Sequence, residues 1–344
     1  MQEFYPFLRV ALFSLLFNYS QAQTLTARPG VSMAPVSNGY YEYLPQGYST
    51  SAPQGYPLML FFHGSGEVGD GVTNLSAVLR NGVARLIGQG TFPKTFTVNG
   101  QTYSFIVLMP QSSNWVSWID VDSMINYAER NYNVDKNRIY LTGLSMGGSP
   151  VWDYPASSVA HAQRVAAILP VSGAYGLYQS GPQNIASGHL PVFATHNLND
   201  PTVSSDLTIN NIDLINNSTN PPPSPRARDS IFNVSGHDAW TVTYDPNIKM
   251  IDGRNVYEWL LTNQRNIVGV PLPVQLTAYS AKASGSYAVI GWTTAMEDNN
   301  RYFILERSGD GQVFTAIDTI AAAGHGGSGA SYRQVDERPL AGVN

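Results

Sequence analysis

A match to the pattern G-x-S-x-G, which can make a serine nucleophilic, occurs at Gly143-Leu144-Ser145-Met146-Gly147. The apolar run Ile139 to Leu141 precedes it and is typical of a buried strand. In a strand–turn–helix of this kind, the glycines leave space where a Cβ would strike the neighbouring backbone, and the serine is held in a strained conformation. The chain contains 31 glycines, so the match alone is also compatible with an ordinary glycine-rich loop. Whether the sequence also offers a base and an acid for this serine distinguishes the two interpretations.

A serine nucleophile needs a base within hydrogen-bond reach. His237 is the expected base, because it lies in the glycine-led loop Gly236-His237-Asp238 after a predicted strand. His196 directly follows the predicted strand 192–195 and is expected to pack beneath the floor of the site. The remaining histidines lie in a turn, in polar segments and in a glycine-rich loop: His63, His161, His189 and His325.

The acid that orients the base is expected between the serine and the histidine in the sequence. Asp200 lies a few residues past the strand 192–195, whereas Asp206 and Asp213 lie further along, in a predicted helix. Asp238 adjoins the base and is expected to cap its loop. Asp200 would accept the Nδ1–H of His237 and stabilise the imidazolium without taking up the proton itself.

Two backbone N–H groups are expected to form an oxyanion hole. One is the amide of Met146, and the other is the amide of Ser65 in the turn His63-Gly64-Ser65-Gly66-Glu67. His63 is expected to shape this turn, and Glu67 to cap the helix that follows it.

Substrate contacts are expected from Trp115, Leu144 and Trp240. Core packing is the alternative for the tryptophans and is the favoured interpretation for Trp118. No two histidines stand at i and i+4, and the sequence has no His-Glu-x-x-His. We therefore expect no metal and no cofactor.

The composition narrows the classes of function. The chain has 344 residues, a net charge of −5 and 12% charged residues, which does not suggest a nucleic-acid partner. It has no cysteine, which excludes disulfides, thiolate metal sites and a cysteine nucleophile.

Four segments are expected along the chain. Residues 1–22 resemble a secretory signal, with the apolar run Val10 to Phe17 and a cleavage site near Ala22. That run is too short to span a bilayer, so we expect a secreted or cell-surface protein without a membrane span after cleavage. A catalytic domain over residues 23–267, a linker at 268–273 and a second domain at 274–344 follow.

Alternating buried strands and amphipathic helices in the catalytic domain predict an α/β fold with a mostly parallel sheet covered on both faces. One of these helices is expected to start at Leu75 and to stop at Gly88. In the second domain, short predicted strands with turns between them indicate a small β-sandwich with Trp292 in its core. Its expected strands are 274–280, 287–293, 302–307, 314–320 and 331–335.

Three motifs make residues 35 to 265 similar to the α/β-hydrolase superfamily: the turn at His63, the stretch from Arg138 to Gly148, and Gly236-His237-Asp238-Ala239-Trp240. More closely, they resemble secreted esterases of the phospholipase/carboxylesterase-like or polyhydroxybutyrate-depolymerase-like kind, a group that includes feruloyl and acetylxylan esterases. The resemblance implies the same triad and oxyanion hole, on a three-layer fold. This sequence departs from the family's His-Gly-x-x-Asp motif at Asn197, which stands where the motif has glycine.

The tail from Leu272 onward resembles the fibronectin type III-like modules of proteins exported by type IX secretion. Such modules continue with two more strands, so we expect an incomplete sandwich with an unpaired sheet edge in a truncated sequence. Export machinery is a possible partner of this region.

The expected function is hydrolysis of carboxylic esters through an acyl-enzyme. The expected substrates are polysaccharide-linked feruloyl or acetyl esters, or similar small acyl esters. The alternatives are a polyester depolymerase or a lipase/phospholipase-like esterase and, from another class, a non-catalytic binding or adhesion protein on a hydrolase scaffold.

Overall fold

The computed structural model describes residues 23–265, 274–297, 302–309, 315–323 and 329–340. The chain divides into two compact units, Met1–Arg265 and Asn266–Asn344. The predicted signal segment 1–22 and the predicted linker 268–273 lie outside the described residues.

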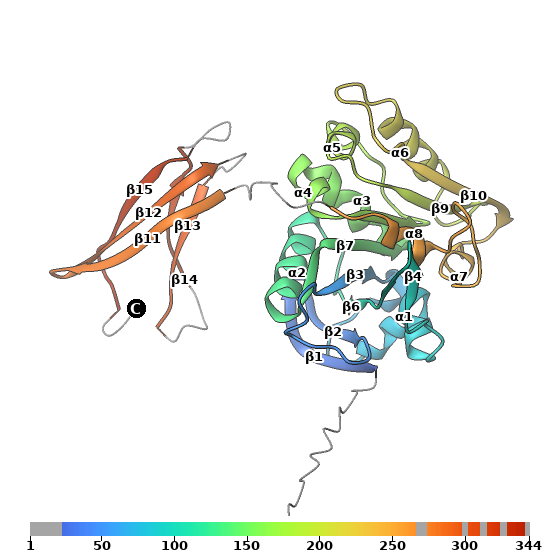
Figure 1. The fold of residues 1–344 in the computed structure, drawn as a ribbon, viewed down its shortest axis with the longest axis horizontal. Coiled ribbons are helices and arrows are strands. Elements are labelled where there is room, and N and C mark those ends of the chain that lie inside the picture. Colours follow the sequence, from blue (N-terminus) through green and yellow to red (C-terminus); the bar gives the residue numbers. More distant parts are fainter. Residues whose placement is uncertain (1–22, 266–273, 298–301, 310–314, 324–328, 341–344) are drawn as a thin grey trace, which may run out of the picture. The chain divides into compact units, whose positions relative to one another are not determined.

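The large unit is built on an eight-stranded sheet with the order β1-β2-β6-β3-β7-β8-β9-β10 (Figure 1). The six strands from β6 to β10 in this order are parallel, while β2 is antiparallel to both of its neighbours. The strands are β1 Thr24–Ala34, β2 Ser37–Leu44, β3 Tyr56–Phe62, β6 Ile106–Pro110, β7 Val134–Leu144, β8 Ala167–Val171, β9 Phe193–Asn199 and β10 Arg228–Ser235.

Helices connect the parallel strands, as the alternation in the sequence predicts. The longest is α2, which starts with a capping box between Ser117 and Asp120 and buries Val121, Met124, Ile125 and Ala128. The α-helices are α1 Gly82–Gly88, α2 Trp118–Asn131, α3 Gly148–Ser157, α4 Val159–Arg164, α5 Gly181–Ser187, α6 Asp206–Asn216, α7 Trp240–Thr243 and α8 Val256–Thr262. The 3₁₀ helices are η1 Ser65–Glu67, η2 Leu75–Arg80 and η3 Ser145–Gly147.

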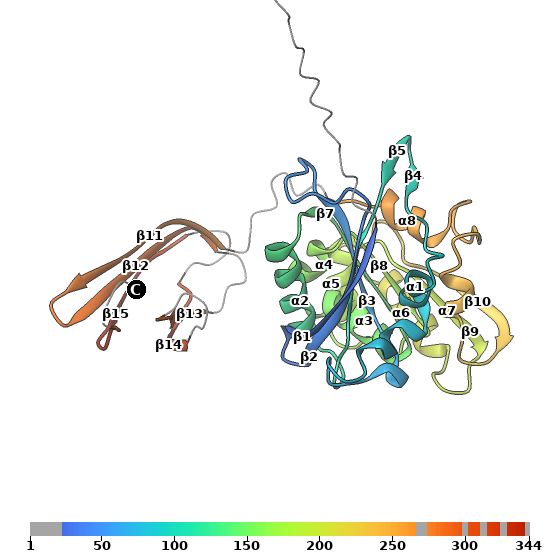
Figure 2. The same ribbon diagram turned by 90° about the horizontal axis from the view of Figure 1, so that it is seen from below.

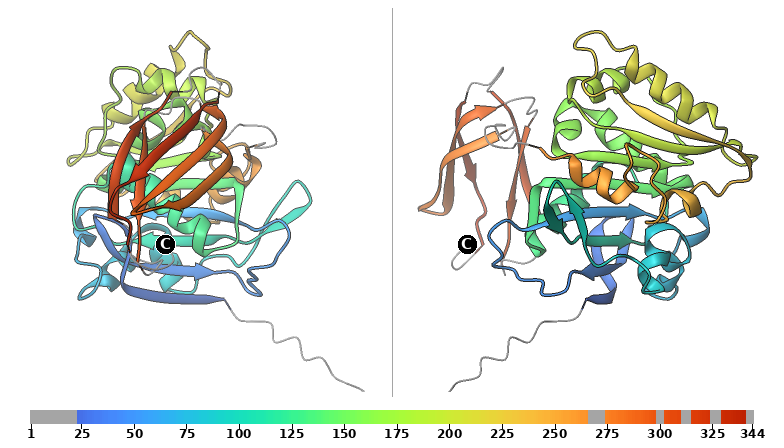
Figure 3. Two further views of the ribbon diagram at one scale, coloured as in Figure 1. Left: turned by 90° about the vertical axis from the view of Figure 1, so that its left-hand side faces the viewer. Right: turned by 45° about the vertical axis from the view of Figure 1, so that its right-hand side comes forward.

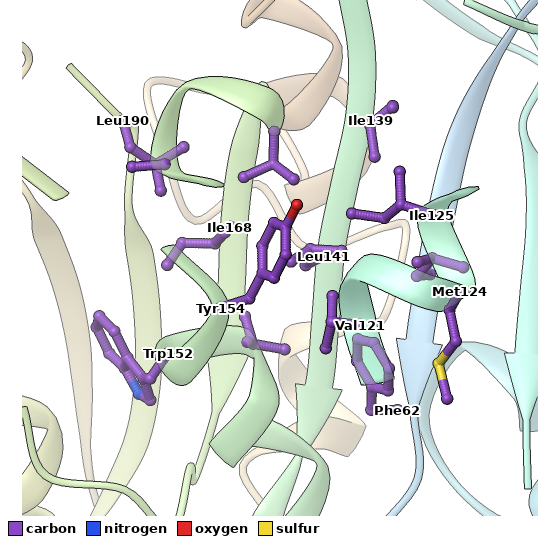
Figure 4. Packing of buried hydrophobic residues seen from close by; sticks show 14 of the residues in the cluster. Phe62, Val121, Met124, Ile125, Ile139, Leu141, Trp152, Tyr154, Ile168 and Leu190 are labelled. Atoms are coloured by element: carbon purple, nitrogen blue, oxygen red, sulfur yellow. The ribbon is translucent and has the colours of Figure 1, made fainter. Parts of the chain in front are cut away.

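The sheet separates two hydrophobic clusters, because successive side chains of a strand point to opposite faces. In β3, Leu58, Leu60 and Phe62 belong to the cluster that includes α2 and α3, while Met59 and Phe61 belong to the cluster that includes α1 and α8. Figure 2 shows these helices on the two sides of the sheet, and Figure 4 shows the packing of the first cluster around Tyr154. The expected α/β class, with a mostly parallel sheet between two layers of helices, is confirmed.

The prediction of one helix from Leu75 to Gly88 is wrong. The helical conformation ends after η2, and a second helix, α1, begins at Gly82. Asn81 is extended, and Gly82 has φ +62° with the ring of Phe61 only 2.7 Å from where a Cβ would stand. This left-handed conformation lets the chain approach the core and cannot continue a helix. The structure also contains a hairpin that the sequence pattern did not predict, formed by β4 Phe96–Val98 and β5 Gln101–Tyr103.

The small unit contains the five strands that the sequence predicts (Figure 3). They form a three-stranded sheet, β11-β12-β15, and a two-stranded sheet, β13-β14. Trp292 is 9% exposed, stacks on Tyr332 and meets Phe303 edge-on, so it is the core tryptophan of this unit as expected. The strands are β11 Val274–Ser284, β12 Tyr287–Glu297, β13 Tyr302–Arg307, β14 Thr315–Ala321 and β15 Ser331–Asp336.

Candidate active site

Three parallel strands of the large unit end beside chemically reactive side chains. Ser145 directly follows β7, Asp200 directly follows β9, and His237 is the second residue after β10. The carboxyl ends of parallel strands meet at one edge of a sheet, so the strand order brings these three loops together.

The turn after β7 has the strained geometry that a nucleophile elbow requires. Ser145 has φ +55°, which is uncommon for a residue with a Cβ. A Cβ on Gly143 would lie 2.2 Å from the carbonyl oxygen of Gly147, and one on Gly147 would lie 2.2 Å from that of Phe62. The two glycines therefore allow the turn to pack against itself and against β3. Pro150 is the third residue of α3, where its missing N–H leaves no helical hydrogen bond unmade.

The three side chains form a continuous hydrogen-bonded chain. Ser145 Oγ lies 2.8 Å from His237 Nε2, and His237 Nδ1 lies 2.6 Å from Asp200 Oδ2. A carboxylate only accepts, so Nδ1 carries the proton and Nε2 accepts from the serine hydroxyl. This arrangement allows Ser145 to lose its proton to His237 as it attacks.

Asp200 is held as an anion by its surroundings. Its side chain is fully buried, and its Oδ1 accepts from the amides of Thr202 at 2.8 Å and Val203 at 3.1 Å. Burial by itself raises the pKa of the carboxyl, but the hydrogen bonds from His237 and the two amides outweigh it, and the pKa lies below its usual value. The acid therefore stays ionised near neutral pH.

The glycine-rich turn after β3 packs directly against the elbow. A Cβ on Gly147 would lie 2.5 Å from the carbonyl oxygen of His63, and one on Gly64 would lie 3.7 Å from the Cβ of Ser145. His63 Nδ1–H donates to the carbonyl of Gly64 at 2.7 Å, and Nε2 accepts from the amide of Ser112 at 2.9 Å. Burial lowers the pKa of His63, so the ring holds this turn in the neutral form.

Ser65 is the first residue of the 3₁₀ helix η1, and Met146 is the second residue of η3, directly after Ser145. Among the described residues, neither donates a backbone hydrogen bond in a turn, loop or cap. Both are therefore available to an external acceptor, which an oxyanion hole requires.

Glu67 does not cap the next helix as expected. Its carboxylate is buried and accepts from the side chain of Asn81 at 2.5 Å, which ties η1 to the residue before α1. Burial raises the pKa of Glu67, although the hydrogen bond from Asn81 opposes this shift. Asp238 caps its own loop as expected, by accepting from Thr241 N at 2.9 Å and Thr241 Oγ1 at 2.8 Å.

The three residues expected to contact substrate differ in position. Trp240 begins α7, and its ring meets that of His237 edge-on at 5.2 Å. Trp115 lies in the loop between β6 and α2 and is 54% exposed. Leu144 is 2% exposed and packs in the cluster around Phe61, so the structure corrects its expected role to core packing.

Two residues that sequence reasoning did not place in the site support it from β9. Asn197, the departure from the family motif, is 3% exposed and donates to the carbonyl of Gly236 at 2.9 Å, directly before His237. His196 is buried, as expected, but it also lies 3.3 Å from Asp200. The replacement of the family's glycine by Asn197 could have indicated a role in the site, but only the fold shows that its side chain binds the carbonyl of Gly236.

Across the described ranges, no group of three or more His, Cys, Asp or Glu side chains is arranged to hold a metal ion. Within those same ranges, no helix combines the length and the apolar character needed to cross a membrane.

No protein-family model matches the chain. Over 109 residues it is 31% identical to the bifunctional acetylxylan esterase/xylanase XynS20E of Neocallimastix patriciarum, a match that covers 29% of this chain and 15% of that protein. The chain therefore spans a small part of this curated relative.

Solved structures with similar folds include a thermostable esterase, with 22% identity and a TM-score of 0.49, covering 71% of this chain and 63% of that one. The feruloyl esterase module from Clostridium thermocellum has 17% identity and a TM-score of 0.45, with 63% and 83% covered. A dienelactone hydrolase from Klebsiella pneumoniae, described as putative, has 14% identity and a TM-score of 0.43, with 69% and 94% covered. The strand order and the elbow of the large unit are those of an α/β-hydrolase fold.

Proposed function

We propose that this protein is a serine esterase that hydrolyses carboxylic esters through an acyl-enzyme. The observation that carries the proposal is the hydrogen-bonded chain from Ser145 through His237 to Asp200, with distances of 2.8 and 2.6 Å. Each member has the chemistry that its position requires, which argues against a binding protein on an inactive scaffold.

In the proposed reaction, Ser145 Oγ attacks the ester carbonyl while His237 Nε2 takes its proton. The amides of Ser65 and Met146 stabilise the oxyanion, and His237 returns the proton to the leaving alcohol. Water activated by His237 then attacks the acyl-enzyme and releases the acid. Asp200 stabilises the imidazolium in both steps, through the bond to Nδ1.

The proposed substrates are acetyl or feruloyl esters linked to polysaccharide, or similar small acyl esters. The identity of 31% with an acetylxylan esterase/xylanase supports this class. We also propose export through the segment 1–22 and a fibronectin type III-like character for the small unit, both of which rest on the sequence resemblance.

One observation favours a second candidate, an esterase for polyesters or lipids. Trp115, Trp118 and Ile119 are 54%, 38% and 56% exposed, on the loop and helix start that follow β6. Exposed apolar side chains beside the strand ends suit an apolar ester more than a hydrated sugar chain.

A hydrolysis panel tests the proposal with p-nitrophenyl acyl esters, methyl ferulate, acetylated xylan and a polyester film. Ser145→Ala should lose activity by at least about 10³-fold. Ser180→Ala, a change of an exposed serine in the same unit, should match the parent. Equal turnover by Ser145→Ala and the parent would rule out the proposed function, and preference for the film over xylan would favour the second candidate.

A further inference from the structure

A second histidine faces the acid of the proposed triad. The side chain of His196 is fully buried, whereas that of His237 is 18% exposed. His196 Nε2 lies 3.3 Å from Asp200 Oδ2, the same oxygen that accepts from His237 Nδ1 at 2.6 Å. One carboxylate oxygen therefore faces two imidazole rings, and the ring of His237 is the one bonded to Ser145.

The hydrogen bonds of His196 define which nitrogen carries its proton. The carbonyl oxygen of Val203, which can only accept, lies 3.0 Å from Nε2, so Nε2 carries the hydrogen. Nδ1 is then an acceptor, and Thr208 Oγ1 donates to it at 2.8 Å. Thr208 is 1% exposed and belongs to α6, so the ring is fixed between β9 and this helix.

Val203 connects the same ring to the acid by a second route. Its carbonyl accepts from His196, while its amide donates to Asp200 Oδ1 at 3.1 Å. The peptide groups of Val203 therefore link the carboxylate of Asp200, through the amide, to the buried imidazole of His196, through the carbonyl. Without the ring, the carbonyl of Val203 would lose its hydrogen-bond donor, and Asp200 Oδ2 would lose its contact with Nε2.

We propose that His196 is a positioning residue of the triad, which as the neutral Nε2–H tautomer fixes the Asp200–Val203 turn and with it the carboxylate that holds His237. This inference rests on the proposed function, and it assigns a role to a side chain that does not touch the substrate.

The neutral form of His196 is essential to this role. Burial lowers the pKa of His196, and the titratable groups that face it among the described residues are Asp200 and His237. A positive charge on His196 would compete with the imidazolium of His237 for the same carboxylate oxygen. A neutral donor supports Asp200 without this competition, so the negative charge remains available when Ser145 attacks.

Two pairs of variants test the proposal. His196→Leu removes the ring, whereas His196→Gln keeps an amide N–H that can reach Val203. Thr208→Val removes the hydroxyl that donates to Nδ1, whereas Thr208→Ser keeps it. The control is His189→Asn, at a loop histidine with φ +49°, a conformation that asparagine tolerates.

We expect His196→Leu to lower kcat by about 10- to 100-fold with KM changed by less than about twofold, because the acid is displaced while the pocket is kept. His196→Gln should recover most of this loss, and Thr208→Val should lose about 2- to 10-fold relative to Thr208→Ser. The low-field proton NMR signal of the His237 Nδ1–H should move in His196→Leu and Thr208→Val but not in His189→Asn.

An unchanged kcat and an unchanged low-field signal in folded His196→Leu would overturn the inference. If His196→Leu does not fold, Thr208→Val decides by the same two measurements. The NMR signal needs no substrate, so it still decides the role of His196 if no ester is hydrolysed. Failure of the proposed function has a different signature, because the parent would then be no more active than Ser145→Ala on every ester.

Discussion

The imidazole of His237 lies 2.6 Å from the carboxylate of Asp200, although the next residue in the sequence, Asp238, is also an acid. The carboxylate of Asp238 is exposed and bonded to Thr241, whereas that of Asp200 is buried and points at Nδ1. Position in the fold, rather than proximity along the chain, therefore selects the acid.

Asp200→Asn should lower kcat by on the order of 10⁴-fold, because an amide cannot hold His237 in the tautomer that accepts from Ser145. The measurement is single-turnover acylation with a p-nitrophenyl ester. Asp238→Asn is the matched control and should stay within about twofold of the parent. A comparable loss in both variants would contradict the assignment of Asp200.

Asn197→Ala should loosen the loop that carries the base. Its side chain donates to the carbonyl of Gly236 at 2.9 Å, and loss of a buried partner costs about 1–3 kcal/mol. We expect a lower free energy of unfolding in urea and a fall in kcat that exceeds any rise in KM. Asn199→Ala, at an exposed position on the same strand, should change neither. Equal effects of the two substitutions would show that the bond to Gly236 is unimportant.

Gly147→Ala should destabilise the elbow severely. The added Cβ would lie 2.2 Å from the carbonyl oxygen of Phe62 and 2.5 Å from that of His63, so the elbow would have to move away from the end of β3. We expect a loss of about 3 kcal/mol or more, or failure to fold. Gly66→Ala meets no atom within 4 Å and should keep the melting temperature of the parent. A stable Gly147→Ala protein would show that the backbone at the elbow can move.

The stability of the large unit should fall as the pH drops below about 6.5. Burial lowers the pKa of His63, while an unfolded histidine takes up its proton near pH 6.5. Between these two pH values the unfolded chain binds more protons than the folded one, so acid favours unfolding. Above pH 6.5 both states are neutral, and the full stability is present.

His63→Asn tests this dependence, because an amide can still donate to the carbonyl of Gly64 but cannot be protonated. Urea unfolding between pH 7.5 and 5.5 should give a flatter dependence in the variant than in the parent. Buried Glu67, whose raised pKa acts in the opposite direction, is present in both proteins and cancels in the comparison. Identical slopes would mean that His63 does not contribute to acid sensitivity.

The strands and the elbow could be predicted because their causes are local. The run from Leu58 to Phe62 is apolar at every position, which suits a strand buried on both faces, and Gly143 and Gly147 stand where a Cβ would collide with nearby backbone. The predicted strands also place Ser145, Asp200 and His237 beyond their carboxyl ends, near one edge of the sheet, although β9 runs to Asn199 and not only to the predicted end at Thr195.

Other features depend on partners that are distant along the chain. The helix expected from Leu75 fails because Gly82 must approach the ring of Phe61, and Leu144 turns into the core although it adjoins Ser145. Neither outcome follows from hydrophobic spacing, because spacing describes one element and not the surface against which it packs.

The amino-acid sequence by itself determined the order of strands and helices, the strained turn at Ser145 and the residue types available for catalysis, since short-range sterics and periodic burial specify them. The sequence also indicated Asp200 as the partner of His237. Only the tertiary structure decided that Asn197 holds the loop of His237 and that His196 lies against Asp200. The physical reason is that hydrogen bonds act over about 3 Å, and only the pairing of β9 with its neighbours brings these side chains within that distance.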